Sequence, residues 1–561
     1  MLLLAQLVAP PIQPGPVRLP STAPQQPQQR SKDDGPLFDE PAGATPQSPT
    51  TPSTTDREQS GAQTVNWRPT IIGKTPYSDA QLQAIVKNCG KASVQATLNA
   101  CAAALTARLI KDGYVNSRVY SLKTPEPGAL EVVLGTIAEL RITSEDEALQ
   151  KQVQQQLTPL IGSVLHIPTL EEELVQVRRR GVGQIKGGMG RLGSDPTKAV
   201  VNLAVSPAEP EPLRGDFTLG NNGNVGSGEW RGVATLLQQG LIERGDTALL
   251  FLELNTDGEL EVGSKVASLT YSYPLSESWT LTGSFGYSYR RFVEFRKPAY
   301  NFHFRTLQGL LQVEHVLKDA DNFRWTASAA FSTNRSDSFK SGQHYPLVTG
   351  GEFDGWTHSG FLKLSTNLGG FNGPVIWNAN AYFSQGIAGV TLDEHLSNLD
   401  EIGISPGEAR AIGTLTDLTW TVSSRTNINL RAAGQLAFAK LPGSMSFGLG
   451  SDMGLRGLPG SLIAGDSGYL GTAELEWTAW QQDEQNVAVI PFMGIGGIHT
   501  KFPDRTFEDS IGVGGLIGRY RNGRWEAELG WVDTFNSNDN PGLWNDWILG
   551  HGLYTKLRYS F

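Results

Sequence analysis

The chain has 561 residues, of which 18% are charged and 39% hydrophobic, with a mean hydropathy of −0.25 and a net charge of −10. No run approaches the 18 or so consecutive apolar residues of a helical membrane span. The net negative charge argues against a general nucleic-acid binder. With only two cysteines, the chain cannot form a disulfide-rich scaffold or a four-cysteine zinc site.

Residues 1–64 have the composition of a non-globular segment. Twelve of the 32 prolines fall between Pro10 and Pro52, among many Gln, Ser and Thr. Proline removes backbone donors, and little in this segment can be buried. The start, M-L-L-L-A-Q-L-V-A, resembles the apolar part of a secretory signal without its basic region. We therefore expect an export-signal remnant followed by a Pro/Gln-rich linker, and a slightly apolar disordered tail is the alternative.

Residues 65–141 predict a small α/β unit. Helices are expected over Asp79–Asn88, with Ser78 or Asp79 as N-cap, and over Ser93–Lys111, which ends at Gly113. Strands follow over 115–122 and 129–135. Cys89 lies near the end of the first helix and Cys101 lies inside the second. In an exported protein they could form a disulfide, and two buried thiols are the alternative.

Residues 142–207 repeat this arrangement more loosely. Helices are predicted over Leu149–Leu157 and Leu170–Arg180, and a closing strand over 200–205. The run P-A-E-P-E-P then forms a linker. Paired carboxylates such as Glu171 and Glu173 are most simply interpreted as a solvated helix face.

From residue 212 to the end the pattern has period two, and 44 of the 49 aromatic residues lie there. In the last strand Leu553, Leu557, Tyr559 and Phe561 share one face. Strands with one apolar and one polar face, and with aromatic residues near their ends, are typical of membrane β-barrels. We predict about 16 antiparallel strands, with a tight turn at R-N-G, 521–523. The predicted ranges are 214–221, 229–239, 246–255, 262–273, 279–290, 303–316, 322–333, 356–367, 374–385, 415–425, 428–438, 468–480, 487–498, 510–519, 524–535 and 551–561.

Three segments carry a resemblance to a known family. They are A-L-T-A-R-L-I-K-D-G-Y-V-N-S-R-V at 104–119, L-G-N-N-G-N-V-G-S-G-E-W-R-G at 219–232, and F-G-L-G-S-D-M-G-L-R-G-L-P-G-S-L-I-A-G-D-S-G-Y-L at 447–470. The first resembles a POTRA domain and the third resembles a loop that folds into a barrel lumen. Over residues 70–561 the chain resembles the transporter component of two-partner secretion, the hemolysin-activator and filamentous-hemagglutinin transporter family.

The resemblance implies an all-β transmembrane barrel, 212–561, preceded by two periplasmic POTRA-like domains, 65–141 and 142–207. It also implies a lumen-inserted loop, 442–467, and a barrel whose last strand ends in an aromatic residue. We expect the candidate loop residues to be Leu455, Arg456, Gly457, Leu458, Gly465, Asp466 and Gly468. The candidate end residues are Tyr559 and Phe561.

In this family the loop arginine pairs with an acidic residue on a wall strand, in a motif like F-x-D-x-G. Here the matching strand reads I-P-F-M-G-I-G-G-I, with Phe492, Gly494 and Gly496 but without the aspartate. A guanidinium has five donors in a rigid fork and needs acceptors when it is enclosed. We therefore predict that Arg456 pairs with Glu474, Glu476 or backbone carbonyls. A solvated arginine in an external loop is the alternative.

The G-D-S-G run at 465–468 matches the nucleophile segment of a trypsin-like protease, but the chain has no matching histidine segment. We interpret its glycines as turn residues. The sequence has no phosphate-binding G-x-x-x-x-G-K-[ST] motif, and the eight histidines lack metal-ligand spacing. We predict no enzyme activity, no cofactor and no metal site.

The resemblance implies an outer-membrane translocator that exports a large partner exoprotein unfolded, with the partner's folding outside the cell as the drive. The expected contacts are that exoprotein, outer-membrane lipid, the barrel-assembly machinery and periplasmic chaperones, but no nucleic acid. The alternatives are a barrel-assembly factor of the same superfamily and a passive porin-like channel.

Overall fold

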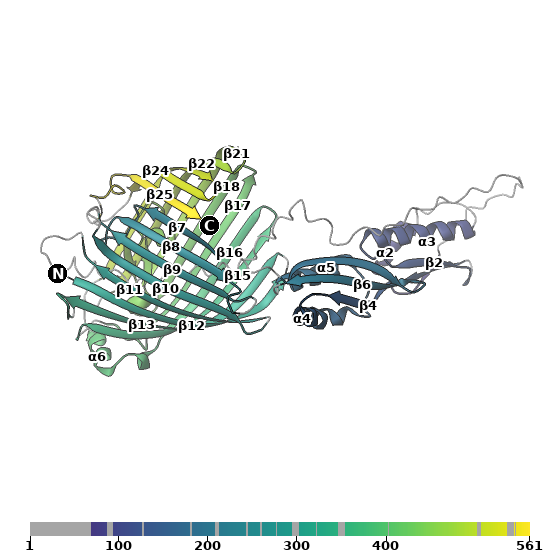
Figure 1. Ribbon diagram of the computed structural model, residues 1–561, viewed down its shortest axis with the longest axis horizontal. Coiled ribbons are helices and arrows are strands. Elements are labelled where there is room, and N and C mark those ends of the chain that lie inside the picture. The colour runs from purple at the N-terminus through teal and green to yellow at the C-terminus, as the bar shows by residue number, and fades with distance from the viewer. Residues whose placement is uncertain are drawn as a thin grey trace, which may run out of the picture. The chain divides into compact units, whose positions relative to one another are not determined.

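In this computed structural model the structure describes residues 69–561, except 87–93, 126–127, 180–181, 208–212, 243–244, 258–260, 277, 294–301, 321, 346–353, 402, 502–505, 536–543 and 545. The chain forms two compact units, an N-terminal α/β unit that ends at Glu209 and a barrel unit that begins at Pro210 (Figure 1). The predicted linker, 1–64, lies outside the described residues.

The N-terminal unit begins with a three-stranded sheet. Its order is β1 (Thr70–Ile72), β3 (Ala129–Val133), β2 (Arg118–Leu122), with β1 parallel and β2 antiparallel to β3. Helix α2 (Asp79–Val86) packs on α3 (Val94–Lys111), and α3 packs on the sheet. Apolar side chains on the inner face of these helices form a core that removes them from water.

The helix boundaries follow the predicted capping residues. The Ser78 hydroxyl accepts from the Gln81 amide at 3.5 Å, while the Ser78 amide donates to the Gln81 side chain at 3.0 Å, a reciprocal capping box. Helix α3 ends at the predicted glycine, because Gly113 adopts a φ of 94° that other residues rarely adopt.

A second three-stranded sheet follows in the same unit. Its order is β4 (Thr136–Thr143), β6 (Asp195–Pro207), β5 (Val182–Leu192), with β4 parallel to β6. It packs against α4 (Glu147–Leu157) and α5 (Ile167–Arg179), and the short helix η1 (Thr158–Leu160) follows α4.

The predicted boundary between the two α/β repeats needs a correction. We placed it between residues 141 and 142, but this position lies inside β4, and β4 pairs with β6 rather than with the first sheet. The second sheet therefore begins at Thr136. Strands β4 and β5 were not predicted. Strand β5 contains four glycines in its sequence, V-G-Q-I-K-G-G-M-G-R-L, a composition that disfavours a strand unless its neighbour supplies the pairing.

The barrel unit confirms the predicted fold class. Within the described residues, sixteen long antiparallel strands close on themselves, and the two-residue β14 (Gln343–His344) extends one hairpin. The sixteen are β7 (Arg214–Gly220), β8 (Trp230–Gln239), β9 (Thr247–Thr256), β10 (Val262–Pro274), β11 (Trp279–Arg291), β12 (Phe302–Ala320), β13 (Phe323–Lys340), β15 (Trp356–Asn372), β16 (Val375–Gly386), β17 (Arg410–Ser423), β18 (Thr426–Ala437), β21 (Ser467–Gln482), β22 (Gln485–Lys501), β23 (Thr506–Asn522), β24 (Trp525–Phe535) and β25 (Leu553–Ser560).

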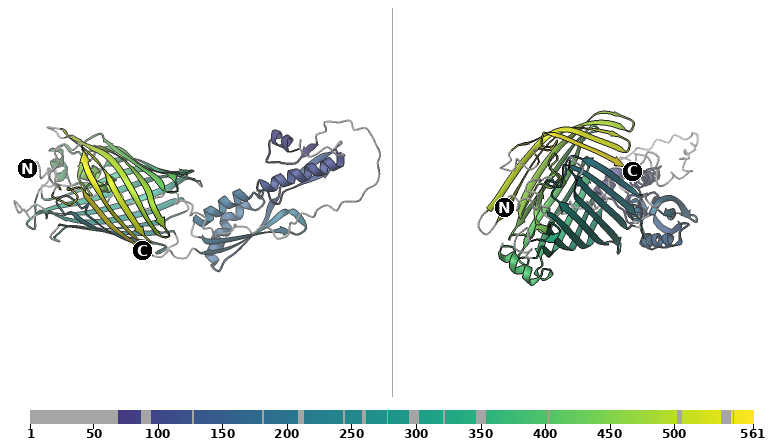
Figure 2. Two further views of the ribbon diagram at one scale, coloured as in Figure 1. Left: turned by 90° about the horizontal axis from the view of Figure 1, so that it is seen from above. Right: turned by 60° about the vertical axis from the view of Figure 1, so that its left-hand side comes forward.

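The connections alternate in length along the chain. Turns such as 373–374, 424–425 and 523–524 join strands at one end, which we call the short-turn end. The predicted turn at R-N-G is of this kind, with Gly523 at a φ of 53°. The opposite, long-loop end carries η2 (Ala388–Val390) and the unpredicted helix α6 (Asp393–Glu401), visible beside the tilted strands (Figure 2).

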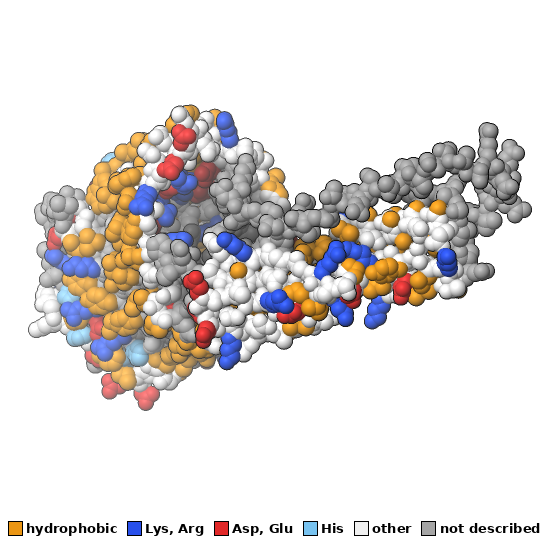
Figure 3. Space-filling model, turned by 45° about the vertical axis from the view of Figure 1, so that its right-hand side comes forward, with side chains coloured by type: hydrophobic (Ala, Val, Ile, Leu, Met, Phe, Trp, Pro, Cys, Tyr) orange, Lys and Arg blue, Asp and Glu red, His pale blue; other side chains and the backbone are white. Residues whose placement is uncertain are grey.

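The two faces of the barrel wall differ in polarity, as the alternation predicts. On β24, Leu529 and Trp531 are 60% and 62% exposed on the outer face, whereas Glu528 is buried on the inner face. Hydrophobic side chains gather on the outside of the barrel (Figure 3). An outer apolar surface with a polar interior is the arrangement of a membrane barrel. None of the described helices has the length and apolar character needed to span a membrane.

Candidate functional site

The connection between β18 and β21, residues 438–466, folds into the barrel interior. It includes η3 (Gly443–Met445) and η4 (Ser451–Met453), and it is organised by a hairpin of β19 (Phe447–Leu449) and β20 (Ile463–Gly465). We call this segment the lumen loop. Its range includes nearly all of the predicted loop, 442–467.

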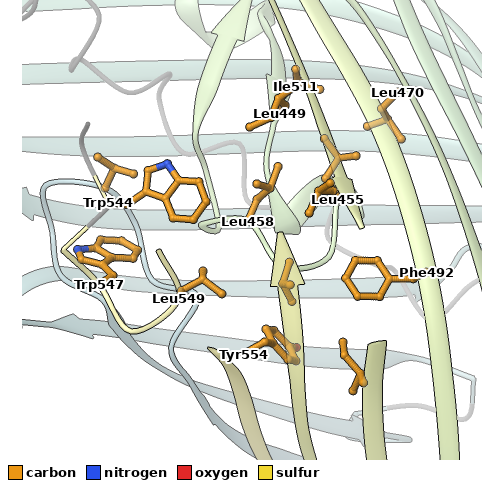
Figure 4. Packing of buried hydrophobic residues seen from close by; sticks show 14 of the residues in the cluster. Leu449, Leu455, Leu458, Leu470, Phe492, Ile511, Trp544, Trp547, Leu549 and Tyr554 are labelled. Atoms are coloured by element: carbon orange, nitrogen blue, oxygen red, sulfur yellow. The ribbon is translucent and has the colours of Figure 1, made fainter. Parts of the chain in front are cut away.

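Apolar side chains of the lumen loop pack against the barrel wall. Leu455 and Leu458 are fully buried, in a cluster with wall residues such as Phe492 and Tyr554 (Figure 4). Trp544, from the connection between β24 and β25, joins the same cluster. Burial of these side chains removes their apolar surface from water, which stabilises the inserted state of the loop.

The predicted wall residues Gly494 and Gly496 make room for this packing. A Cβ atom at Gly494 would lie 2.9 Å from Leu455 Cδ2, and one at Gly496 would lie 2.8 Å from Leu449 Cδ2. Both distances are shorter than ordinary van der Waals contact. The glycines that we identified from the strand sequence thus form the wall surface against which the loop leucines lie.

At the loop tip, Gly457 is required by both conformation and space. Its φ is 83°, and an added Cβ would lie 2.2 Å from Val532 Cγ1 on β24. A side chain here would strain the backbone and collide with the wall. Gly457 therefore allows the preceding residue, Arg456, to approach the wall closely.

Arg456 makes ion pairs with two wall carboxylates. Its Nε donates to Glu474 Oε1 at 2.9 Å and its Nη2 to Glu474 Oε2 at 3.3 Å, on β21. Its Nη1 donates to Glu528 Oε2 at 2.9 Å, on β24. Charge-assisted pairs with this bidentate geometry are both strong and directional. The three side chains are largely enclosed, with exposed fractions of 20%, 18% and 1%.

Glu528 connects this pair to a longer charged network. Its Oε1 accepts from Arg519 Nε at 2.9 Å and its Oε2 from the Tyr554 hydroxyl at 3.2 Å. The other predicted candidate, Glu476, instead pairs with Arg519 Nη1 at 2.9 Å. Glu528 and Glu476 thus share the wall cation Arg519, so that Glu528 has a cationic partner besides Arg456.

The G-D-S-G run shapes the base of the lumen loop. Asp466 Oδ1 accepts from the Leu441 amide at 3.0 Å, and the Ser467 hydroxyl accepts from the Ala437 amide at 3.0 Å. An added Cβ at Gly468 would lie 2.3 Å from Phe447 Cδ1, and one at Gly465 would lie 2.9 Å from Ile498 Cβ. These contacts hold the two ends of the loop together where it leaves the wall.

The predicted C-terminal residues lie where the barrel closes. Phe561 exchanges backbone hydrogen bonds with Gly215 at 3.0 and 3.1 Å, and its ring stacks on Phe217 with centroids 5.6 Å apart. Tyr559 lies beside Trp525, with centroids 4.7 Å apart. The last residues therefore contribute to the pairing of β25 with β7.

The predicted disulfide involves a residue outside the described part of the chain. Cys101 is buried in α3, and its thiol donates to the Val86 carbonyl at 3.9 Å. Cys89 lies outside the described residues, so a bond between the two stays a prediction. Among the residues that the structure describes, no group of His, Cys, Asp and Glu side chains is arranged to hold a metal ion.

Sequence reasoning missed two groups of functional residues. The first is Glu528 with Arg519 and Tyr554. In the sequence Glu528 alternates with apolar neighbours, but only the strand order brings β24 close to the loop. The second is an ion pair between Asp452 of the lumen loop and Arg231 of β8, which in turn binds Glu253 of β9. These residues lie far apart in the sequence, and no local pattern connects them.

Comparisons with known proteins agree on the architecture. The model of the family described as haemolysin secretion/activation protein ShlB/FhaC/HecB matches residues 198–516. No curated protein matches the sequence.

Solved structures resemble the chain over most of its length. CdiB from Escherichia coli has a TM-score of 0.62 at 16% identity, covering 91% of this chain and 93% of its own. CdiB from Acinetobacter baumannii has a TM-score of 0.57 at 14% identity, covering 89% and 91%. BamA from Haemophilus ducreyi lacking POTRA domains 1–3 has a TM-score of 0.50 at 13% identity, covering 89% and 100%. At these identities the likeness concerns the fold.

Proposed function

The chain belongs to the haemolysin secretion/activation protein family ShlB/FhaC/HecB, the transporter components of two-partner secretion, and on that premise we propose that it captures one secreted exoprotein with its N-terminal unit and exports it unfolded through its barrel. The family acts in the outer membrane and implies a secreted exoprotein partner. The steps of capture, passage and gating are our proposal for this chain.

The observation that carries the proposal is the lumen loop. Arg456 holds the loop to Glu474 and Glu528, and Leu455 and Leu458 are buried with it. A chain in transit would have to occupy the space that the loop fills. We propose that the loop moves out of the lumen during export and returns afterwards, with its ion pairs exchanged for water.

The composition of the inner wall supports the passage of an unfolded chain. Charged side chains such as Arg519 of β23, Glu476 of β21 and Glu526 of β24 face inward. An unfolded polypeptide carries an unpaired backbone donor or acceptor at nearly every residue. A wetted, charged wall can satisfy these groups without offering a lasting apolar binding site.

The N-terminal unit has the features of a capture site for an extended segment. Its two sheets have strands at their edges, β2 in the first sheet and β5 in the second. An edge strand presents backbone donors and acceptors, to which an extended partner can add as a further strand. We propose that this unit lies in the periplasm and receives the exoprotein there.

The experiment that tests this function is deletion of residues 69–207 in a strain that also produces the exoprotein. We expect export to be lost while the barrel still inserts and conducts ions in planar bilayers. Export at the parental level by the shortened chain would contradict capture by the N-terminal unit. Loss of insertion would instead assign this unit to barrel assembly.

A further inference from the structure

The lumen loop has a second anchor, on the opposite side of the place where the barrel closes. Asp452 pairs with Arg231 Nη1 of β8, and Arg231 Nη2 lies 2.6 Å from Glu253 Oε2 of β9. Arg231 and Glu253 are 11% and 5% exposed, so this arginine is enclosed between two carboxylates. We call Asp452, Arg231 and Glu253 the second anchor.

Backbone contacts reinforce the second anchor. The Gly460 amide donates to the Asn222 and Gly223 carbonyls at 3.1 and 2.9 Å, and the Ser461 amide donates to Asn224 Oδ1 at 3.0 Å. These acceptors lie in the connection between β7 and β8. An added Cβ at Gly460 would lie 2.8 Å from Arg231 Nη1. The loop is therefore fitted to this side of the barrel as closely as to the side that holds Arg456.

The two anchors lie on either side of one strand junction. The strand order around the closure is β21-β22-β23-β24-β25-β7-β8-β9. Arg456 binds β21 and β24, which precede the β25–β7 junction, whereas Asp452 binds β8, which follows it. One continuous segment of five residues, from Asp452 to Arg456, therefore spans the junction from inside.

The β25–β7 junction is also the shortest ladder between neighbouring long strands of the described barrel. It pairs five residues of each strand, Asp216–Gly220 with 556–560. The Asn221 side chain supplements it by donating to the Leu553 carbonyl at 2.7 Å and accepting from the Thr555 amide at 3.0 Å. A ladder this short gains more from a support across it than the long ladders elsewhere do.

We propose that the lumen loop is an internal strap that holds the β25–β7 junction closed, with the second anchor fastening its far side. Release of the loop then weakens the junction as well as freeing the lumen. This inference rests on the proposed function only in assigning loop release to export. Both the strap and its effect on the junction are properties of the resting barrel.

Charge balance predicts how the second anchor responds to substitution. Changing Asp452 to Asn removes one carboxylate but leaves the enclosed Arg231–Glu253 pair intact, so the barrel should still fold. Changing Arg231 to Gln leaves Asp452 and Glu253 facing each other without their shared cation, which is the costlier change. We therefore expect the Arg231→Gln variant to be the less stable of the two.

The test compares Asp452→Asn with and without a disulfide across the junction. Leu219→Cys and Leu557→Cys form a register pair on the outer face of β7 and β25, in a background with Cys89→Ala and Cys101→Ala. The readout is the temperature at which the full-length protein loses its compact migration on SDS gels. We expect Asp452→Asn to lower this temperature by about 5 °C in the reduced protein, and to have no effect once the junction is oxidised.

Two controls make the result specific to the junction. Glu476→Gln removes an inner-wall ion pair that holds Arg519 rather than the loop. A disulfide between Ala379→Cys and Thr416→Cys joins β16 to β17, away from the junction, and should not suppress the Asp452→Asn shift. Asp452→Ser should repeat the pattern of Asp452→Asn.

Three results would overturn the strap. The first is a shift for Asp452→Asn no larger than that for Glu476→Gln. The second is a shift that persists in the oxidised junction variant, and the third is equal suppression by the β16–β17 disulfide. The readout is melting of the resting barrel and does not depend on export. The strap proposal can therefore be disproved while export is normal, and the export proposal can be disproved while the strap proposal stands.

Discussion

Arg456 binds both oxygens of Glu474, with its Nε 2.9 Å from Oε1 and its Nη2 3.3 Å from Oε2. The two residues are 18 positions apart in the chain, and the bond joins the tip of the lumen loop to strand β21. Because the pair is bidentate, it fixes the direction of the loop tip as well as its distance from the wall.

Replacing Arg456 with Ala should weaken export while the barrel still assembles. The change leaves Glu474 enclosed without its loop partner, at a cost of about 3 kcal/mol to the inserted state of the loop. Export of the exoprotein and heat-dependent gel migration measure the two effects. Arg521→Ala is a matched control, because Arg521 pairs with Glu526 and makes no such bond to the loop. Parental export by the Arg456→Ala variant would remove the role assigned to this residue.

Gly457→Ala should destabilise the inserted loop by about 2 kcal/mol, since the residue has a φ of 83° and a Cβ would meet Val532. Gly471→Ala on β21 is the control, because a Cβ there meets no atom within 4 Å. Single-channel conductance in planar bilayers reports the position of the loop. We expect more frequent open events for Gly457→Ala than for Gly471→Ala, and identical traces would contradict the assigned role.

The N-terminal unit should lose stability in acid through Asp112. Its Oδ2 accepts from the Tyr77 hydroxyl at 2.8 Å and from Arg108 Nε at 2.7 Å. These bonds, that from Tyr77 first, lower the pKa of Asp112 below its ordinary value of 3.8. A carboxyl whose pKa is lower in the folded state stabilises the fold above its unfolded pKa, and this contribution is lost as the pH falls through the folded pKa.

Asp112→Asn should therefore reduce amide-exchange protection in α3 at pH 7, and its difference from the parent should shrink as the pH falls below 3.8. Glu172→Gln, a change at an exposed position of α5, is the control and should leave this protection unchanged. A difference that is constant with pH would show that the ionised carboxylate contributes nothing.

Much of the barrel could be predicted from the sequence because its strands carry their own pattern. In residues 524–531 polar and apolar side chains alternate, and the structure places Leu529 and Trp531 on the outer face of β24 and Glu528 on the inner face. The strand ends were less accurate. The predicted strand 303–316 is Phe302–Ala320 in the structure, because hydrogen bonding to β13 continues beyond the apolar part of the strand.

The site could be predicted only in part. Arg456 and Glu474 stand out because a glycine-rich loop and the following strand are adjacent in the chain. Glu528 and Arg231 reach the loop through barrel closure, which brings residues more than 70 and 200 positions apart into contact. No local periodicity contains that information. Likewise the predicted domain boundary fell inside β4, because its partner β6 follows more than 50 residues later.

The central claim is that the lumen loop must leave the wall for export, and a reversible cross-link tests it most directly. Leu455→Cys with Gly494→Cys would join the loop to β22, where Leu455 Cδ2 and a Cβ at Gly494 are 2.9 Å apart. We predict that export stops in the oxidised protein and returns on reduction, while Leu455→Cys alone, which leaves Gly494 unchanged, exports under both conditions. Continued export by fully cross-linked protein would contradict the account.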